Sequence, residues 1–167
     1  MKLSNQKQFP NQIRFCLFFF DRHHQGSING LVYSSNGFYL ISSDENGDLC
    51  LSDAENKYKS LKILQNVLVR NENSSLALST SSDRKYIVYI GPTEYLVTII
   101  ETNTLNQTLR IDISSCTYVT DEQQTVTSAE AALFARFTPS RFLLVATKTF
   151  RLLKFDSYSG KLLNIVR

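Results

Sequence analysis

Residues 24–53, HQGSINGLVYSSNGFYLISSDENGDLCLSD, contain the pattern that decides the fold. Their apolar residues fall in short runs that are separated by clusters of Ser, Asn, Gly and Asp, which is typical of strands and turns. The pairs Asn36-Gly37 and Asn46-Gly47 tolerate a positive φ, as tight hairpin turns require. The stretch therefore predicts three short strands joined by two hairpin turns.

The same punctuation continues along the chain and predicts an all-β protein. The three prolines fall outside the predicted strand interiors, where a missing N–H would break a ladder of hydrogen bonds. Strands are predicted at residues 12–20, 28–34, 38–43, 48–52, 60–69, 74–79, 85–91, 95–101, 107–113, 132–137, 142–147, 150–155 and 161–166.

The hairpin pattern recurs twice, in residues 76–101 and 133–156. A period of roughly 40–45 residues is the signature of four-stranded propeller blades. Successive copies are offset by 45 and then 59 residues, so the second interval carries an insertion, which we place in the polar stretch 114–130 as a surface loop. From the apolar residue before each turn to the closing acid, the copies span 20, 23 and 19 residues: Tyr33 to Asp53, Leu78 to Glu101 and Phe137 to Asp156.

These copies resemble the WD repeat. His24 stands where the family has the His of its Gly-His pair, and Ser52-Asp53 stands where it has Trp-Asp. In the later copies, Ile100-Glu101 and Phe155-Asp156 occupy the Trp-Asp position. The resemblance implies a β-propeller fragment of about three four-stranded antiparallel blades.

The resemblance also implies a hydrogen-bond network in the first blade. In the family, the His at the position of His24 bonds toward a second-strand Ser, here Ser42, and toward the Trp. Because Ser52 replaces the Trp and Asn46 occupies the usual Asp position, the network is incomplete, and we do not assume that it forms.

The predicted organisation follows the repeats. It comprises an N-terminal arm or outer strand at 1–23, blades at 24–70 and 71–113, an inserted surface loop at 114–130 and a blade at 131–167. Three blades cannot close a propeller, and open blade faces need a cover. We therefore expect further sequence, another chain or a second copy to complete the propeller.

Candidate chemistry is sparse, and no metal or cofactor is predicted. The adjacent His23 and His24 would point to opposite faces of an extended segment and have no third ligand nearby in sequence. No Gly-x-Ser-x-Gly, P-loop or dinucleotide motif occurs. Hairpin turns explain the acids Asp44, Glu45, Asp48, Asp53 and Glu55, and packing explains the thiols Cys16, Cys50 and Cys116.

The segment IRFCLFFF, residues 13–20, is too short to span a bilayer and lacks a small-residue cleavage site. We interpret it as a buried strand. The alternative is an arm that docks on a partner protein through Phe18, Phe19 and Phe20.

The function expected from the resemblance is a non-catalytic scaffold for protein–protein interactions, in the cytoplasm and in a cytoskeletal or ciliary assembly. One alternative is an enzymatic or ligand-binding propeller, although Asn29, Ser74 and Glu130 at the first-strand ends form no coherent set. The other is nucleic-acid binding, which the net charge of +3 supports only weakly. It would use a basic C-terminal stretch: Arg141, Lys148, Arg151, Lys154, Lys161 and Arg167.

Overall fold

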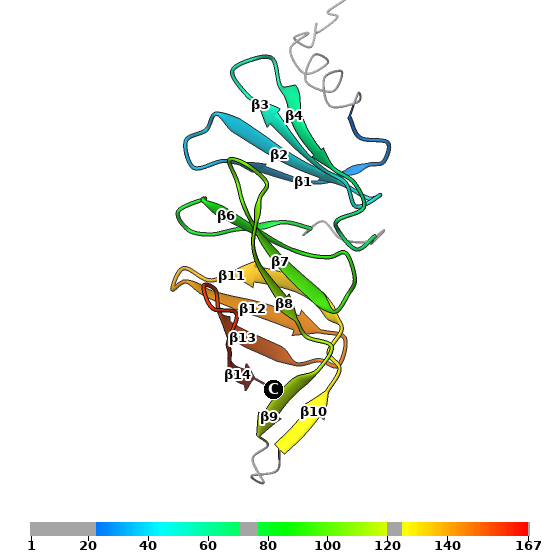
Figure 1. Cartoon of the computed structure of the whole chain (residues 1–167), viewed down its shortest axis with the longest axis vertical. Coiled ribbons are helices and arrows are strands. Elements are labelled where there is room, and N and C mark those ends of the chain that lie inside the picture. The colour runs from blue at the N-terminus through cyan, green and yellow to red at the C-terminus, as the bar shows by residue number, and fades with distance from the viewer. Residues whose placement is uncertain (1–22, 71–76, 120–124, 167) are drawn as a thin grey trace, which may run out of the picture.

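Three four-stranded antiparallel sheets dominate the computed structural model (Figure 1), which describes residues 23–70, 77–119 and 125–166. Each sheet has its strands in chain order, and a separate two-stranded hairpin is inserted between the second and third sheets. The first sheet contains β1 (Ile28–Tyr33), β2 (Tyr39–Asp44), β3 (Leu49–Asp53) and β4 (Lys59–Leu64). The second contains β5 (Ser79–Thr80), β6 (Tyr86–Ile90), β7 (Leu96–Glu101) and β8 (Gln107–Asp112). The third contains β11 (Ala132–Phe137), β12 (Phe142–Thr147), β13 (Leu152–Asp156) and β14 (Leu162–Val166), and the hairpin contains β9 (Cys116–Val119) and β10 (Thr125–Ser128).

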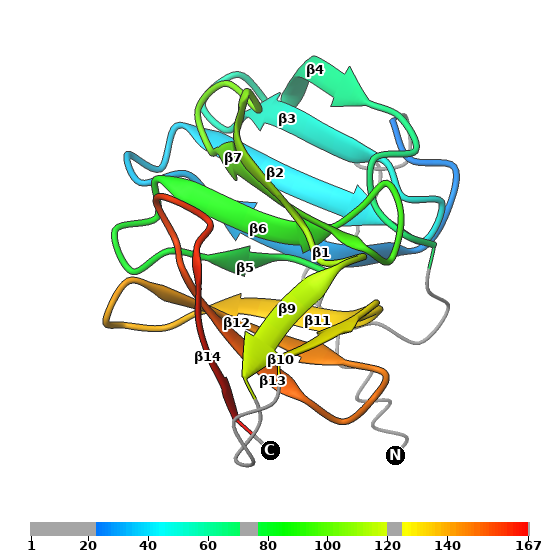
Figure 2. The ribbon, with the colours of Figure 1, turned by 60° about the horizontal axis from the view of Figure 1, so that its bottom comes forward.

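The predicted all-β fold of three four-stranded antiparallel units is confirmed. The predicted strand at 12–20 lies outside the described residues. The sheets stack face to face (Figures 1 and 2), with one apolar core between the first and second sheets and another between the second and third. Fully buried aliphatic side chains fill the two cores, among them Ile41, Leu49 and Ile87 in the first and Val97, Leu143, Val145 and Leu153 in the second.

The first hairpin of each sheet uses the same turn. One residue has a positive φ in each case: Gly37 at 77°, Arg84 at 56° and Arg141 at 64°. Glycine adopts this conformation readily because it has no Cβ, whereas the Cβ of an arginine is crowded there, so both arginines are in an unfavourable backbone conformation. The three turns lie along one edge of the stack, which is on the left in Figure 2 and is called the β1–β2 edge below.

The opposite edge, called the β2–β3 edge, joins neighbouring sheets through backbone hydrogen bonds. Leu68 N donates to Gly47 O at 3.0 Å and holds the segment after β4 against the first sheet, and Val69 N donates to Ile90 O at 2.9 Å and links this segment to the second sheet. Ala132 N donates to Glu94 O at 2.7 Å and so links the second and third sheets. The predicted strand 60–69 is therefore wrong in its second half, because β4 ends at Leu64 and the following residues bond across this edge.

The inserted segment 114–130 also differs from the prediction. It was expected to be a surface loop without strands, but β9 and β10 pair as an antiparallel hairpin. Its residues include Thr, Val and Tyr, whose side chains suit a pleated surface, and this preference outweighs the polar composition. The hydroxyls of Thr117 and Thr127 are 2.9 Å apart across the pair.

Candidate interaction surfaces

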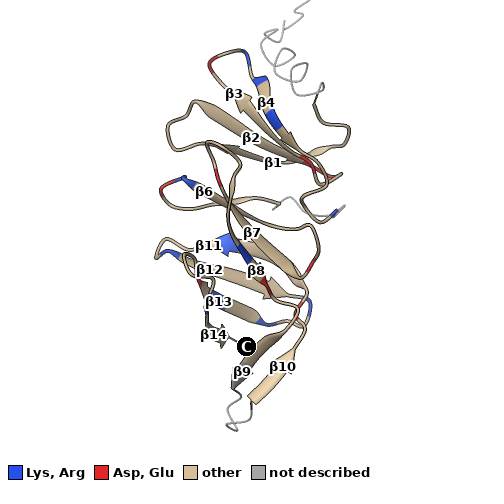
Figure 3. Cartoon of the chain, in the orientation of Figure 1, with Lys and Arg blue, Asp and Glu red and all other residues tan. Residues whose placement is uncertain are grey.

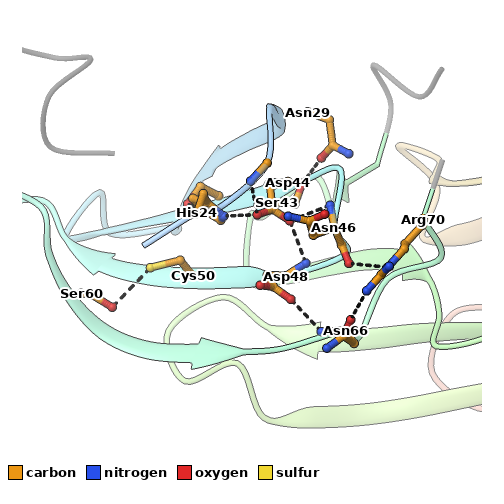
Figure 4. Close-up of polar contacts among 12 residues, drawn as sticks. His24, Asn29, Ser43, Asp44, Asn46, Asp48, Cys50, Ser60, Asn66 and Arg70 are labelled. Atoms are coloured by element: carbon orange, nitrogen blue, oxygen red, sulfur yellow. Dashed lines mark hydrogen bonds and ion pairs between the residues drawn. The ribbon is translucent and has the colours of Figure 1, made fainter. Parts of the chain in front are cut away.

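His24 and Ser42 are in contact at the β2–β3 edge of the first sheet. His24 Nε2 lies 2.6 Å from Ser42 Oγ, and both side chains are buried. His24 Nδ1 lies 3.1 Å from Asp44 Oδ2, where it forms an ion pair when the ring is protonated rather than a well-aligned hydrogen bond (Figure 4). The expectation for Asn46 is corrected, because the carboxylate beside His24 belongs to Asp44, the last residue of β2.

Asp44 also organises the turn that follows it. Its Oδ1 accepts the backbone N–H groups of Asn46 and Asp48, each at 3.0 Å. Burial raises the pKa of Asp44, but the hydrogen bond from the Asp48 N–H and the proximity of the His24 ring outweigh burial and lower the pKa below its usual value. The network extends across the edge (Figure 4), since Asp48 Oδ1 accepts Asn66 N at 2.8 Å. Asp44 and Asp48 therefore bond to backbone N–H groups in and beside the turn, but Asp44 is buried and is not the solvated turn residue that was expected of these acids.

The third sheet carries a different polar cluster at the same edge, centred on Glu130. This carboxylate is 0% exposed and accepts hydrogen bonds from the Ser128 and Thr149 hydroxyls and from the Arg151 guanidinium. Arg151 Nη1 also donates to Ser128 Oγ at 2.9 Å. Burial raises the pKa of Glu130, but these donors outweigh burial and hold its pKa below the usual range.

The two clusters occupy equivalent places in their sheets. Asp44 pairs with the first residue of β1, and Thr147 pairs with the first residue of β11. Counting on from these two residues, Gly47 corresponds to Phe150. Sequence reasoning named Glu130 without any partner and did not identify Phe150, although an alignment of the two turns would have placed Phe150 opposite a turn glycine.

Phe150 is the most exposed large apolar side chain among the described residues. It is 93% exposed and has a φ of 60°, whereas Gly47 has a φ of 87°. An aromatic residue in this conformation is an outlier, and such outliers concentrate at functional sites. Its neighbours Thr149 and Arg151 both bond to Glu130, so Phe150 projects from a turn that is held on both sides.

The outer faces of the two end sheets expose further apolar side chains. Leu31 pairs with Ser42, which pairs with Cys50, which in turn pairs with Ile63, so these side chains share one face. Neighbouring positions such as Ile41 face the core, so this face points away from the second sheet. Leu31 is 55% exposed and Ile63 is 41% exposed. On the third sheet, Phe134 faces away from the core in the same way and is 38% exposed.

The other repeat positions support turns. Asp53 Oδ1 accepts Glu55 N, Glu101 Oε2 accepts the Thr104 hydroxyl, and Asp156 Oδ1 accepts Ser159 N. Phe155, beside Asp156, is 2% exposed in the core. Phe18, Phe19 and Phe20 lie outside the described residues, as do Ser74 and Cys16.

Two cysteines are buried packing residues, as predicted. Cys50 is in the first sheet and Cys116 is in β9. Burial, together with the charges of Glu130 and Asp112, raises the pKa of Cys116 to about 11, so this thiol is protonated at neutral pH.

Among the described residues, the basic C-terminal side chains do not form a single patch, and Arg167 lies outside the described residues. Lys148 forms an ion pair with Glu94, and Arg151 forms one with Glu130. Lys154 Nζ lies 3.8 Å from the centroid of the Phe142 ring. Figure 3 shows the Lys and Arg residues dispersed over the three sheets, with acidic residues between them.

Within the described ranges, no group of three or more His, Cys, Asp and Glu side chains is placed to hold a metal ion. The same residues include no helix that is long and apolar enough to cross a membrane.

Solved structures with WD40 repeats share this arrangement. The WD40 repeats of RRP9 superpose with a TM-score of 0.58 and 17% identity, over 87% of this chain and 40% of that chain. The dihydro-heme d1 dehydrogenase NirN superposes with a TM-score of 0.53 and 19% identity, over 83% of this chain and 27% of that chain. These similarities establish the fold, and because NirN is an enzyme, the fold does not determine the activity.

Sequence relatives identify the family. WD repeat-containing protein 90 of Xenopus tropicalis is 33% identical over 84% of this chain. The chain spans only 7–8% of the length of the curated relatives that it matches. The family model of the WDR90/POC16 second β-propeller matches residues 14–167, so the predicted WD-repeat resemblance is confirmed and the chain belongs to this propeller family.

Proposed function

We propose that this chain is a non-catalytic interaction module that forms part of a larger WD-repeat propeller. The observation that carries the proposal is the exposure of apolar side chains on the two outer faces: Leu31 and Ile63, on the outer strands β1 and β4 of the first sheet, and Phe134 on the third sheet. Each blade of a propeller normally buries such a face against its neighbour. The short span of the chain within its relatives supports flanking blades as the cover.

Phe150 supports a second contact, with a separate partner protein. It lies at the β2–β3 edge, which flanking blades in a propeller leave open because they cover sheet faces. Exposed aromatic side chains that enter a partner's pocket often dominate the binding energy of an interface. We propose a cytoplasmic protein assembly, cytoskeletal or ciliary, as the setting, since divergent WD-repeat proteins are frequent there.

The structure supports the nucleic-acid alternative less well. Lys148 and Arg151 are paired with carboxylates, and Lys154 lies over an aromatic ring. Phosphate binding would require releasing these cations from their intramolecular partners. Among the described residues no catalytic constellation supports the enzymatic alternative, because Glu130 and Asp44 accept hydrogen bonds at hairpin turns and His24 bonds to Ser42.

Analytical ultracentrifugation tests the proposal. The isolated chain should self-associate with increasing concentration, and a longer protein that includes the flanking sequence should be monomeric. The double variant Leu31→Ser/Ile63→Ser should reduce the self-association, whereas Phe38→Ser, a change at an exposed aromatic residue beside a hairpin turn, should not. An isolated chain that is monomeric and melts sharply would count against the proposal.

A further inference from the structure

A pocket of about 120 Å³ lies at the β1–β2 edge, between the second and third sheets. The β5–β6, β11–β12 and β13–β14 turns and strands β7 and β8 supply its walls. Drug-sized ligands usually occupy pockets of about 300–1,000 Å³, so this one has room for a single large side chain.

The pocket combines an apolar floor with a polar rim. Ile99, Leu109 and Phe137 contribute the apolar floor. Arg141 and Asp83 contribute charges to the rim, and hydroxyl groups of neighbouring Ser and Thr residues lie between them. A side chain with an apolar body next to a charged group would satisfy both parts.

Arg141 is the group on the rim that has the most unused hydrogen-bonding capacity. Its Nη1 donates to Tyr158 OH at 3.3 Å, and the guanidinium forms no ion pair with any of the described residues. An Arg side chain has five N–H donors in a fork that matches a carboxylate. The Ser157 hydroxyl donates to Arg141 O at 2.6 Å and holds its backbone in place.

Arg141 has an unusual backbone conformation that it shares with Arg84. Its φ is 64°, at a turn position that Gly37 occupies in the first sheet. A glycine would adopt this conformation with less strain. Arg84 has the same conformation in the second sheet but is not among the lining residues, so it provides a matched control.

The negative charge of Asp83 affects which anions can bind at the rim. Hydrogen bonds from the Ser81 hydroxyl and the Lys85 N–H lower the pKa of Asp83, so its carboxylate is charged at neutral pH. This charge would repel a phosphate dianion more strongly than a singly charged carboxylate. A carboxylate on an otherwise apolar ligand is therefore the better match.

We propose that this pocket binds a segment of a partner protein in which a large apolar residue adjoins Glu or Asp. The apolar side chain enters the pocket and the carboxylate pairs with Arg141. The site rests on the proposed scaffold function and names the chemistry of one contact within it.

The test is an NMR titration of the chain with the blocked dipeptide acetyl-Leu-Glu-amide, with acetyl-Leu-Gln-amide as its neutral counterpart and with inorganic phosphate. We expect saturable shifts in the backbone amides of residues 81–86, 137–141 and 157–159, and roughly tenfold or more weaker binding of the Gln peptide. Arg141→Gly should abolish binding of the Glu peptide, and Arg84→Gly should leave it unchanged.

Equal affinity for the two peptides, an unchanged affinity in Arg141→Gly, or phosphate binding as tight as that of the Glu peptide would overturn the proposal. Both glycine variants relieve a positive φ, and only Arg141→Gly removes a guanidinium from the pocket. A loss of binding in Arg141→Gly alone therefore reports the guanidinium and not misfolding. The ultracentrifugation result is independent of this pocket. A chain that self-associates through its outer faces but binds neither peptide would overturn the pocket alone.

Discussion

The first and third sheets hold their β2–β3 edges together with different side chains. At the β2–β3 edge, the first sheet uses His24, Ser42 and Asp44, and its turn contains a glycine. The third sheet uses Glu130 and Arg151, and its turn contains Phe150. The comparison shows that the strand register of a blade can be the same when different polar side chains stabilise its edge.

The largest effect is expected in the third sheet. Glu130→Ala should lower the free energy of unfolding by about 3 kcal/mol, because it leaves Arg151 without its buried partner and the Thr149 hydroxyl without its acceptor. Urea denaturation followed by circular dichroism measures this change. Glu94→Ala removes an exposed carboxylate and is the control, for which little change is expected. Equal losses in the two variants would mean that the Glu130 cluster is not specially stabilising.

The glycine turn of the first sheet should be nearly as sensitive. In Gly47→Ala, the new Cβ would meet Leu68 O at 2.4 Å in addition to the positive φ, and the loss should be about 2 kcal/mol. Gly37→Ala is the control, because it has a similar φ and nothing within 4 Å of the new Cβ. Thermal melting compares them, and a loss in Gly37→Ala as large as in Gly47→Ala would contradict the role of the close approach.

The contact between His24 and Ser42 should contribute a smaller, pairwise effect. A double-mutant cycle with His24→Ala and Ser42→Ala should give a coupling energy of about 1 kcal/mol, since the pair is buried and hydrogen-bonded. Denaturant titration of the four proteins measures this coupling. Strictly additive losses would show that the contact contributes nothing beyond the packing of each side chain.

The Glu130 cluster and the Asp44 cluster should lose their contributions to stability over different ranges of acidic pH. The folded pKa of Glu130 lies below its usual value of 4.5, so its ionised form stabilises the fold above pH 4.5, and this contribution is lost as the pH falls through the folded pKa. For Asp44 the same reasoning applies below 3.8. Denaturation at a series of pH values measures how the free energy of unfolding falls with acid. The part of this fall that begins near pH 4.5 should be missing in Glu130→Gln and retained in Asp44→Asn. The reverse order would contradict the assignment.

The smallest effect is expected at Phe150. Phe150→Gly should raise the free energy of unfolding by at most about 1 kcal/mol, because relief of the positive φ is partly offset by the entropy of an unfolded glycine. Differential scanning calorimetry measures this gain. A clear loss of stability would mean that the ring packs on the fold and is not a free contact for a partner.

The repeated hairpins could be predicted from the sequence because local patterns specify them. Asn36-Gly37 and the spacing to Asp53 are visible without knowledge of the fold, and the corresponding sheet forms. The Glu130 cluster could not be predicted, because Thr149 and Arg151 meet Glu130 only after β11 and β12 have paired.

The conformations of two turns also could not be predicted from local sequence patterns. Arg84 and Arg141 adopt the conformation of Gly37, but arginine carries no local signal for a positive φ. Family spacing places Asn46 at the usual Asp position and so predicts an incomplete network, whereas the backbone brings the earlier acid Asp44 beside His24.

Ile113 holds the two ends of the β9–β10 hairpin together. Ile113 N donates to Tyr95 O at 2.8 Å, and Ile113 O accepts Glu130 N at 2.9 Å, so the chain leaves and rejoins the stack at one buried residue. The base of the hairpin is part of the stack, because Cys116 packs in the core between the second and third sheets and Ser128 bonds to Glu130 and Arg151. An epitope or a fluorescent label is therefore better grafted between Thr117 and Thr127 than at the base, where it would disturb both contacts.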